Sequence, residues 1–301
     1  MSTSSPPPPP ASLPADTVLL AGRPVHRVGF GAMQLPGPGV LGPPADRDQA
    51  LAVLRRAVDR GVNHIDTAQF YGPDVANELI REALFPYPAD LVLVSKVGAD
   101  RDGKGQWLPA QRPEDLRAGV VANLASLGLE QIPVVNLRRH PDADHVPFAE
   151  QLEAMAGMKD EGLIGGIGLS TVTLEQYRLA RRTVEVACVQ NAYNLADRSD
   201  QPVFDACRSD GVPYVPYFPL GSAFVPDSPV LNAPAVTDAA GRLGATPAQV
   251  ALAWLLTRAP TVLIIPGTSS PAHLDQNLAA GDLVLDHRAL EEIDGTAEAT
   301  G

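Results

Sequence analysis

The sequence predicts a single α/β domain, a (β/α)₈ barrel of the TIM type, with a short N-terminal β-hairpin and a disordered, proline-rich N-terminal tail. Three observations support this fold. A short run rich in β-branched residues followed by an amphipathic helix recurs eight times between residues 17 and 295. The 26 glycines and 30 prolines require many tight connections, which disfavours a helical bundle. The glycine fingerprint of a doubly wound dinucleotide-binding sheet is incomplete in GFGAMQ (29–34) and in GIGLST (166–171), which both lack the third glycine.

The N-terminal part of the chain divides into a tail and the start of the barrel. Residues 1–15, with five consecutive prolines, favour polyproline II and cannot join a sheet, so we expect a disordered tail there and the barrel over 16–301. TVLLAG and VHRVGF predict the hairpin. The first barrel strand, VGFGAM (28–33), precedes a helix over 46–61, which shows apolar residues at helical spacing and ends at a glycine.

Seven further strand–helix pairs follow in the same pattern. Prolines at first helical positions, at Pro113 and after Thr246, mark where two of the helices begin. The predicted pairs are 63–67 with 74–84, 90–96 with a helix from 113, 132–137 with 148–159, 163–170 with 174–182, 184–190 with 202–209, 212–218 with a helical region that includes 249–256, and 261–267 with 271–280.

The composition excludes several classes of function. A net charge of −12 would repel a phosphate backbone, so nucleic acid is not an expected partner. The sequence lacks both an 18-residue apolar span and a secretory leader pattern, so we expect a cytoplasmic protein without membrane contact, as a monomer or a simple homo-oligomer. Cys188 and Cys207 show neither disulfide-framework nor zinc-ligand spacing, and no metal site is expected.

The active site of a (β/α)₈ barrel lies at the C-terminal ends of its strands, so the polar residues that end apolar runs are candidates. These are Asp66, Lys96, Asn136 or Arg138, Ser170, Gln190 and Tyr217. Asp66 and Lys96 end neighbouring strands and should pair, and Tyr71 follows five residues after Asp66. An ammonium beside the phenol would make Tyr71 a better proton donor, with Asp66 holding the ammonium in place. A structural ion pair with an unrelated tyrosine at the rim is the alternative from geometry alone.

Six motifs at matching strand ends, in order, resemble the aldo-keto reductase superfamily over about residues 17–295. They are DTAxxYG (66–72), LVLVSK ending at Lys96, GIGLS (166–170), VQNAYN (189–194), YFPLG (217–221) and IPGTSSPAHLDQN (265–277). The longer forms GAMQLPGPGVLGPP, GVNHIDTAQFYGP and VPYFPLG resemble the pyridoxal reductase (pyridoxine 4-dehydrogenase) branch of that family.

The resemblance implies that NADPH, or NADH as the alternative, binds across the barrel mouth and gives a hydride to a small polar aldehyde, most plausibly pyridoxal in a reversible reaction, with Tyr71 as proton donor. Ser170 and Gln190 would hold the nicotinamide carboxamide, Tyr217 would stack on the ring, and the backbone of Phe218, Leu220 and Gly221 would face the pyrophosphate. The further positions that the resemblance implies for the cofactor are Gly31, Met33, Asp66, Gly267, Thr268, Ser269, His273, Gln276 and Asn277. Phe70, Trp107 and Phe224, on or beside the loops after the strands, are candidates for the walls of the substrate pocket, and each has packing within its loop as the alternative.

The sequence departs from the family pattern at two places. The family's catalytic histidine at the end of strand 4 aligns with Arg138, which we prefer as the fourth catalytic residue, while His140 would face the same way if the strand were bulged. A guanidinium could orient a carbonyl oxygen but could not act as a neutral imidazole. The Lys and Arg that grip the adenosine 2′-phosphate in many members align with Gly267 and His273, so both fixed charges are missing.

Three other functions remain open at this point. A general aldehyde, ketone or sugar reductase of the same superfamily would keep the mechanism and change the substrate. A catalytically silent module that binds nicotinamide and regulates something else is favoured only by the missing histidine. A TIM-barrel enzyme with metal or paired-carboxylate chemistry is disfavoured, because no strand ends present such a cluster.

Overall fold

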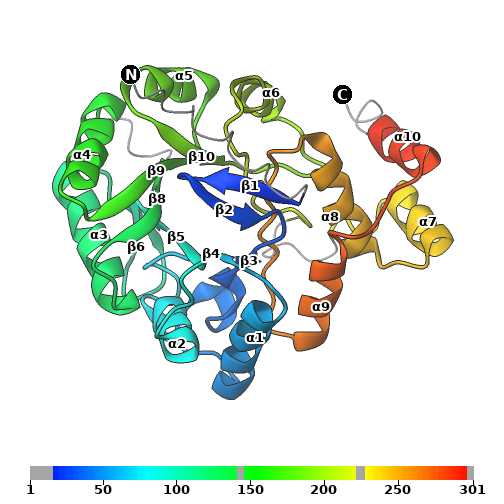
Figure 1. Cartoon of the computed structure of the whole chain (residues 1–301), viewed down its shortest axis with the longest axis horizontal. Coiled ribbons are helices and arrows are strands. Elements are labelled where there is room, and N and C mark those ends of the chain that lie inside the picture. Colours follow the sequence, from blue (N-terminus) through cyan, green and yellow to red (C-terminus); the bar gives the residue numbers. More distant parts are fainter. Residues whose placement is uncertain (1–15, 141–145, 222–227, 297–301) are drawn as a thin grey trace, which may run out of the picture.

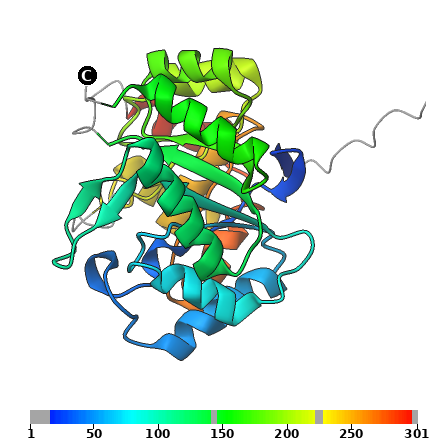
Figure 2. The same cartoon turned by 90° about the vertical axis from the view of Figure 1, so that its left-hand side faces the viewer.

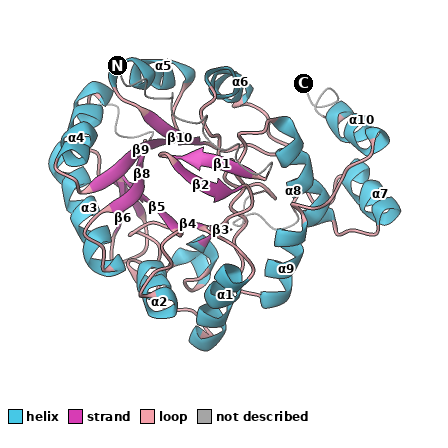
Figure 3. Ribbon diagram, in the orientation of Figure 1, coloured by secondary structure: helices cyan, strands magenta, loops and turns pink. Residues whose placement is uncertain are grey.

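A computed structural model of the chain describes residues 16–140, 146–221 and 228–296. Its centre is a curled, six-stranded sheet in which all neighbouring strands are parallel, in the order β10, β9, β8, β5, β4, β3. Helices surround this sheet on its outer side (Figures 1 and 3). The strands of the sheet are β3 (Phe30–Gly31), β4 (His64–Asp66), β5 (Val92–Val97), β8 (Ile132–Arg138), β9 (Ile164–Ser170) and β10 (Val186–Gln190). The predicted alternation of strand and helix is therefore present.

The helices begin where the sequence offers capping groups. Thr173 and Thr246 each accept a hydrogen bond from the backbone N–H three residues on, and a glutamine at that position bonds back. The helices are α1 (Arg47–Asp59), α2 (Val75–Leu84), α3 (Pro113–Leu127), α4 (Phe148–Asp160), α5 (Leu174–Thr183), α6 (Gln201–Asp210), α7 (Pro234–Leu243), α8 (Pro247–Arg258), α9 (Pro271–Ala279) and α10 (His287–Gly295), with 3₁₀ turns η1 (Ala32–Gln34) and η2 (Pro38–Val40). None of the helices in the described part of the chain is long and apolar enough to cross a membrane.

The seventh and eighth predicted strands are reduced to single parallel bridges. Tyr214 bridges to Val189 of β10 on one side and to Val262 on the other, and Ile264 bridges to Val28 just before β3. These bridges lead from one edge of the six-stranded sheet to the other edge. Prolines 213 and 216 flank the seventh segment, and a proline has no N–H with which to continue a ladder.

The N-terminal hairpin closes one end of the curled sheet. Strands β1 (Thr17–Leu20) and β2 (Arg23–His26) pair antiparallel as predicted. They lie across the middle of the arrangement of curled sheet and surrounding helices (Figure 1). Leu20 and Val25 are buried in one cluster with Val94, Val134 and Leu263 from the sheet interior. The predicted tail, residues 1–15, lies outside the described residues.

Two elements were not predicted from the sequence. The long connection 98–112, expected to be a loop, contains the antiparallel hairpin β6 (Ala99–Arg101) and β7 (Trp107–Pro109), at the end of the molecule opposite β1 and β2 (Figure 2). The Asp102 carboxylate shapes its turn by accepting the backbone N–H groups of Lys104 and Gln106.

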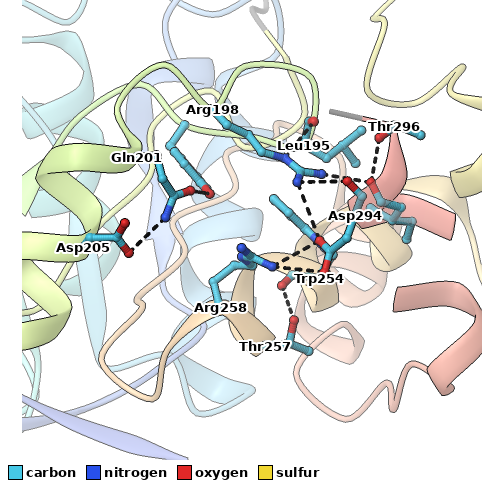
Figure 4. Close-up of polar contacts among 11 residues, drawn as sticks. Leu195, Arg198, Gln201, Asp205, Trp254, Thr257, Arg258, Asp294 and Thr296 are labelled. Carbon is cyan, nitrogen blue, oxygen red and sulfur yellow. Dashed lines mark hydrogen bonds and ion pairs between the residues drawn. The ribbon is translucent and has the colours of Figure 1, made fainter. Parts of the chain in front are cut away.

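Helix α10 is the second unpredicted element, and one carboxylate anchors it to α8. Asp294 accepts a hydrogen bond from the Trp254 indole at 2.9 Å and from Arg258 at 3.1 Å (Figure 4). Arg198 donates to the carbonyl of Ile293 at 2.9 Å from the connection between β10 and α6. These contacts hold the C-terminal helix against the outside of the ring.

Candidate active site

A cavity of about 560 Å³ opens at the C-terminal ends of the strands, where the sequence predicts the site. Its volume is within the range of about 300–1,000 Å³ that small-molecule sites occupy. Many of the predicted residues line it: Gly31, Met33, Asp66, Tyr71, Trp107, Arg138, Gln190, Tyr217, Phe218, Leu220, Gly221, Gly267, Thr268 and Ser269. The fold thus brings these residues from seven separate segments to one cavity.

The floor of the cavity holds the predicted ion pair. Lys96 and Asp66 are buried, with 1% and 3% of their surface exposed, and the Lys96 ammonium donates to Asp66 Oδ1 and to the Thr67 carbonyl. Gln190 donates from Nε2 to Asp66 Oδ2 at 2.9 Å. Burial opposes the charged form of Lys96, but attraction to Asp66 and Tyr71 outweighs burial and raises the pKa of Lys96. The ammonium therefore stays protonated at neutral pH.

Tyr71 lies directly against this ammonium. Lys96 Nζ is 5.0 Å from the centroid of the Tyr71 ring, and the tyrosine is 5% exposed. The turn that carries Tyr71 is fixed at its two ends: its backbone N–H donates to Ala68, and its carbonyl accepts from Ala76 at the start of α2. A phenol, an ammonium and a carboxylate are therefore joined in one buried cluster at the cavity.

A second polar network lies behind the ion pair, between the sheet and helices α2 and α3. Thr67 donates to Asn77 at 2.8 Å, and Asn77 donates to Asn123 at 2.9 Å. Asn123 also accepts from Ser95 at 2.5 Å and donates to the Lys96 carbonyl at 3.4 Å. These side chains are buried and bond one another, so they fix the backbone on both sides of the ion pair.

Ser170 and Gln190, the two residues predicted to bind the carboxamide, lie on the neighbouring strands β9 and β10 at one edge of the sheet. Ser170 pairs in register with Gln190 and with Arg138, but it is fully buried and does not line the cavity. Thr171 has φ +58°, an uncommon conformation for a β-branched residue, and its hydroxyl is 3.5 Å from the Tyr217 hydroxyl. Such strain costs about 1–3 kcal/mol and gathers at functional sites.

Two further segments, 217–221 and 265–269, also line the cavity. Phe218 has φ +55°, and its carbonyl accepts from Asn194 at 3.1 Å. In the second segment, Thr268 and Ser269 lead into α9, which Ser270 caps by accepting from the His273 N–H. His273 and Gln276 are exposed on α9 and Asn277 is buried, and none of these three lines the cavity.

The substrate side of the cavity favours one of two alternatives at each of two positions. Arg138 lines the cavity at the end of β8, whereas His140 does not. Phe70 is not a cavity wall: it is 1% exposed and packs edge-on against Tyr71 and Trp107, with ring centroids 5.5 Å apart in each case. Burial in the loop's own core removes it from contact with a ligand. Phe224 lies outside the described residues.

Several residues of the site were missed by sequence reasoning. Gln34, Ser228, Leu231, Ile265 and Pro266 line the cavity. Arg101 packs over Trp107, with Cζ 4.2 Å from the ring centroid. The only sequence signal for Arg101 was a charged residue in the connection 98–112, and such a residue usually faces solvent.

Comparison with known proteins identifies relatives of this chain. The model of the aldo/keto reductase family matches residues 27–298. Pyridoxine 4-dehydrogenase of Escherichia coli is 50% identical over 285 residues, which cover 93% of this chain and 98% of the relative. An uncharacterized oxidoreductase of Schizosaccharomyces pombe is 37% identical over 282 residues, covering 93% of this chain and 89% of the relative.

Solved structures show the same likeness in three dimensions. The crystal structure of an aldo/keto reductase from Klebsiella pneumoniae in complex with NADP and acetate superposes with a TM-score of 0.78 at 28% identity, covering 93% of this chain and 95% of that one. The family match over residues 27–298 spans the segments that line the cavity.

Proposed function

This chain belongs to the aldo/keto reductase family, and from that premise we propose that it is an NADPH-dependent reductase of small polar aldehydes, with pyridoxal as its substrate and Tyr71 as the proton donor. The observation that carries the proposal is the buried cluster of Asp66, Lys96 and Tyr71 at the floor of the cavity. The identity to pyridoxine 4-dehydrogenase, over nearly the whole of both chains, supports the substrate.

The residues around the cavity fit a nicotinamide cofactor. Asp66, Gln190 and Tyr217 line the cavity together, where a carboxamide and a flat ring would bind, and Tyr217 offers an aromatic face. The turn at Phe218 and Gly221, both with positive φ, also lines the cavity, and Ser269 precedes the N-terminus of α9. The backbone N–H groups of such a turn are suited to a pyrophosphate. When bound, the reduced nicotinamide supplies the hydride that adds to the carbonyl carbon.

The chain's own residues manage the proton. Tyr71 gives its hydroxyl proton to the carbonyl oxygen as the carbon accepts the hydride, which leaves a phenolate. The Lys96 ammonium stabilises that phenolate, and Asp66 holds the ammonium in place by accepting its hydrogen bond. Arg138 faces the same cavity and would orient the carbonyl or a neighbouring acceptor as a donor with permanent charge. Tyr71 then regains a proton from solvent.

The proposal includes a closed barrel. The parallel bridges at Tyr214, Val262 and Ile264 support segments 214–217 and 262–265 as the seventh and eighth members of the ring. These two segments carry Tyr217 and Ile265 to the cavity, so the cofactor site depends on their position.

The test is NADPH oxidation by the purified chain with pyridoxal, compared with a panel of small aldehydes, ketones and sugars and repeated with NADH. We expect pyridoxal with NADPH to give the highest kcat/KM. Turnover of other carbonyls but not of pyridoxal would keep the mechanism and reject the substrate. NADPH binding without any turnover would reject the reductase function in favour of a regulatory module that binds nicotinamide.

A further inference from the structure

The charges that line the cavity are unbalanced. Asp66 and Arg138 are its two charged lining residues in the described part of the chain. Asp66 is already engaged by Lys96 and Gln190, so its charge is neutralised within the floor. Arg138 has no such partner there: its Nε is buried and makes no hydrogen bond to any residue that the structure describes. One positive charge is therefore left facing the cavity.

A second guanidinium stands behind the first. Arg138 Cζ lies 6.0 Å and Arg101 Cζ 4.2 Å from the centroid of the same Trp107 ring. Arg101 is 9% exposed, and its Nε and Nη1 are buried without a hydrogen-bond partner among the described residues. Among the described residues, its side chain donates a hydrogen bond from Nη2 to the carbonyl of Gly39, which carries no charge. Two partly desolvated cations against one indole ring repel each other, and an anion beside them lowers that cost.

Arg138, Arg101 and Trp107 together form a cationic wall, and the fold holds this wall in place without a ligand. Arg101 and Trp107 are direct partners in the register of β6 and β7, and the Gln111 amide donates both to Gly98 and to the carbonyl of Arg138. Gln151 in turn bonds Gln111. The hairpin and the end of β8 are thus tied together, which favours binding because little ordering remains to be done.

From these contacts we infer that the cavity takes carbonyl compounds that carry an anionic group, a carboxylate or a phenolate, received by Arg138, with Trp107 and Arg101 as the supporting wall. This inference rests on the proposed reductase function and names its substrate class. A guanidinium binds a carboxylate through two parallel hydrogen bonds, and the Trp107 ring suits a planar substrate. The whole chain carries a net charge of −12, which repels anions in general. The positive charges of this wall therefore attract an anionic substrate only locally.

The test compares substrates in pairs in which one methylation removes the negative charge: 3- and 4-carboxybenzaldehyde against their methyl esters, and pyridoxal against 3-O-methylpyridoxal, all with NADPH. We expect wild type to prefer at least one anionic member over its neutral partner by about tenfold or more in kcat/KM. Arg138→Gln should bring that ratio close to one, Arg138→Lys should keep part of it, and Arg101→Gln should lower it by a severalfold factor through KM with the Kd for NADPH unchanged. Arg182→Gln, which removes the same charge from an exposed site on α5, is the matched control and should leave the ratio as in wild type.

The outcomes separate this inference from the function on which it rests. Equal turnover of acids and esters by wild type would overturn the inference and leave the reductase intact, and this comparison needs no folded variant. If Arg138→Gln or Arg101→Gln weakens NADPH binding and leaves the charge preference unchanged, the wall belongs to the cofactor site. That result would also overturn the inference. No turnover of any aldehyde would reject the proposed function itself.

Discussion

At the scale of single residues, the buried pair of Asp66 and Lys96 holds a charged ammonium beside Tyr71. The pair is almost fully enclosed, and its remaining bonds go to Thr67 and Gln190. Taking two charges out of water is costly, and here each charge makes the other tolerable. Removal of one partner would leave an uncompensated charge in the interior.

This pair gives the first prediction. Lys96→Met should lower the free energy of unfolding by about 3–5 kcal/mol, because Asp66 is left buried and unpaired. The double variant Asp66→Leu/Lys96→Met should recover much of that loss, since neither charge remains, while both variants lose turnover. Chemical denaturation followed by circular dichroism measures the difference. A single variant as stable as wild type would contradict the assigned burial of the pair.

His64 lies on β4 two residues before Asp66 and gives a pH dependence of stability. It is fully buried, its Nδ1 has no hydrogen-bond partner among the described residues, and burial lowers its pKa from 6.5 to about 4. Between these two values the unfolded chain binds a proton that the folded chain does not, so stability is complete above pH 6.5 and falls as the pH drops towards 4.

The second prediction follows from that sign. Wild type should lose on the order of 3 kcal/mol more stability than His64→Leu between pH 6.5 and pH 4. The measurement is the difference between the two unfolding curves across this range, which removes the common contribution of the carboxylates. The exposed His287 provides a control, and His287→Asn should track wild type. Parallel curves for His64→Leu and wild type would show that His64 takes up its proton in the folded state.

At the scale of elements, α2 and α3 act on the site through the network of Thr67, Asn77, Asn123 and Ser95. The network ties the end of β4 to the end of β5 from behind. Asn123 alone bonds to Ser95, Asn77, the Lys96 carbonyl and the Gly119 carbonyl, so it is the centre of the network. Neither asparagine lines the cavity.

The third prediction is that Asn123→Leu lowers the free energy of unfolding by about 2–4 kcal/mol, because several buried groups lose their partner. It should also reduce kcat by about tenfold or more with the Kd for NADPH within twofold of wild type, since small displacements of Lys96 and Tyr71 are costly in rate. Ser126→Ala is the control, because Ser126 accepts from Asn77 at the edge of the network and otherwise bonds backbone carbonyls of its own helix. Unchanged kcat in a destabilised Asn123→Leu would restrict the network to stability.

The elements also show where sequence reasoning stops. Periodic apolar residues and capping signals located the main helices, because burial of one face and the free N–H groups of a first turn have local signatures. The hairpin of β6 and β7 has three residues in each strand, too few for a period to be read. Helix α10 has a local signal that was missed, the N-cap Asp286, which accepts from the Ala289 N–H. Its anchoring by Asp294 to distant Trp254 and Arg258 leaves no local pattern (Figure 4).

At the scale of the whole molecule, the site is assembled by topology. Parallel strands end at one edge, so Asp66, Lys96, Gln190 and Tyr217 could be assigned to one place from the sequence. The positions of side chains on the connections between strands and helices could not be assigned in this way. Phe70 packs against the Tyr71 ring, and Arg101 packs over the Trp107 ring. Successive side chains of a strand point to opposite faces of the sheet, so the sequence predicts their direction. The direction of a loop side chain depends on which partner it packs against.

The central claim is that Tyr71 is the proton donor, and Tyr71→Phe tests it most directly. NADPH binding, followed by quenching of protein fluorescence, and NADPH oxidation with pyridoxal are measured on the same preparations of wild type and variant. We predict a Kd for NADPH within about twofold of wild type and a fall in kcat of about 10²–10⁴-fold, the contribution of a positioned acid. A Tyr71→Phe variant that binds NADPH and reduces pyridoxal at the wild-type rate would contradict the account.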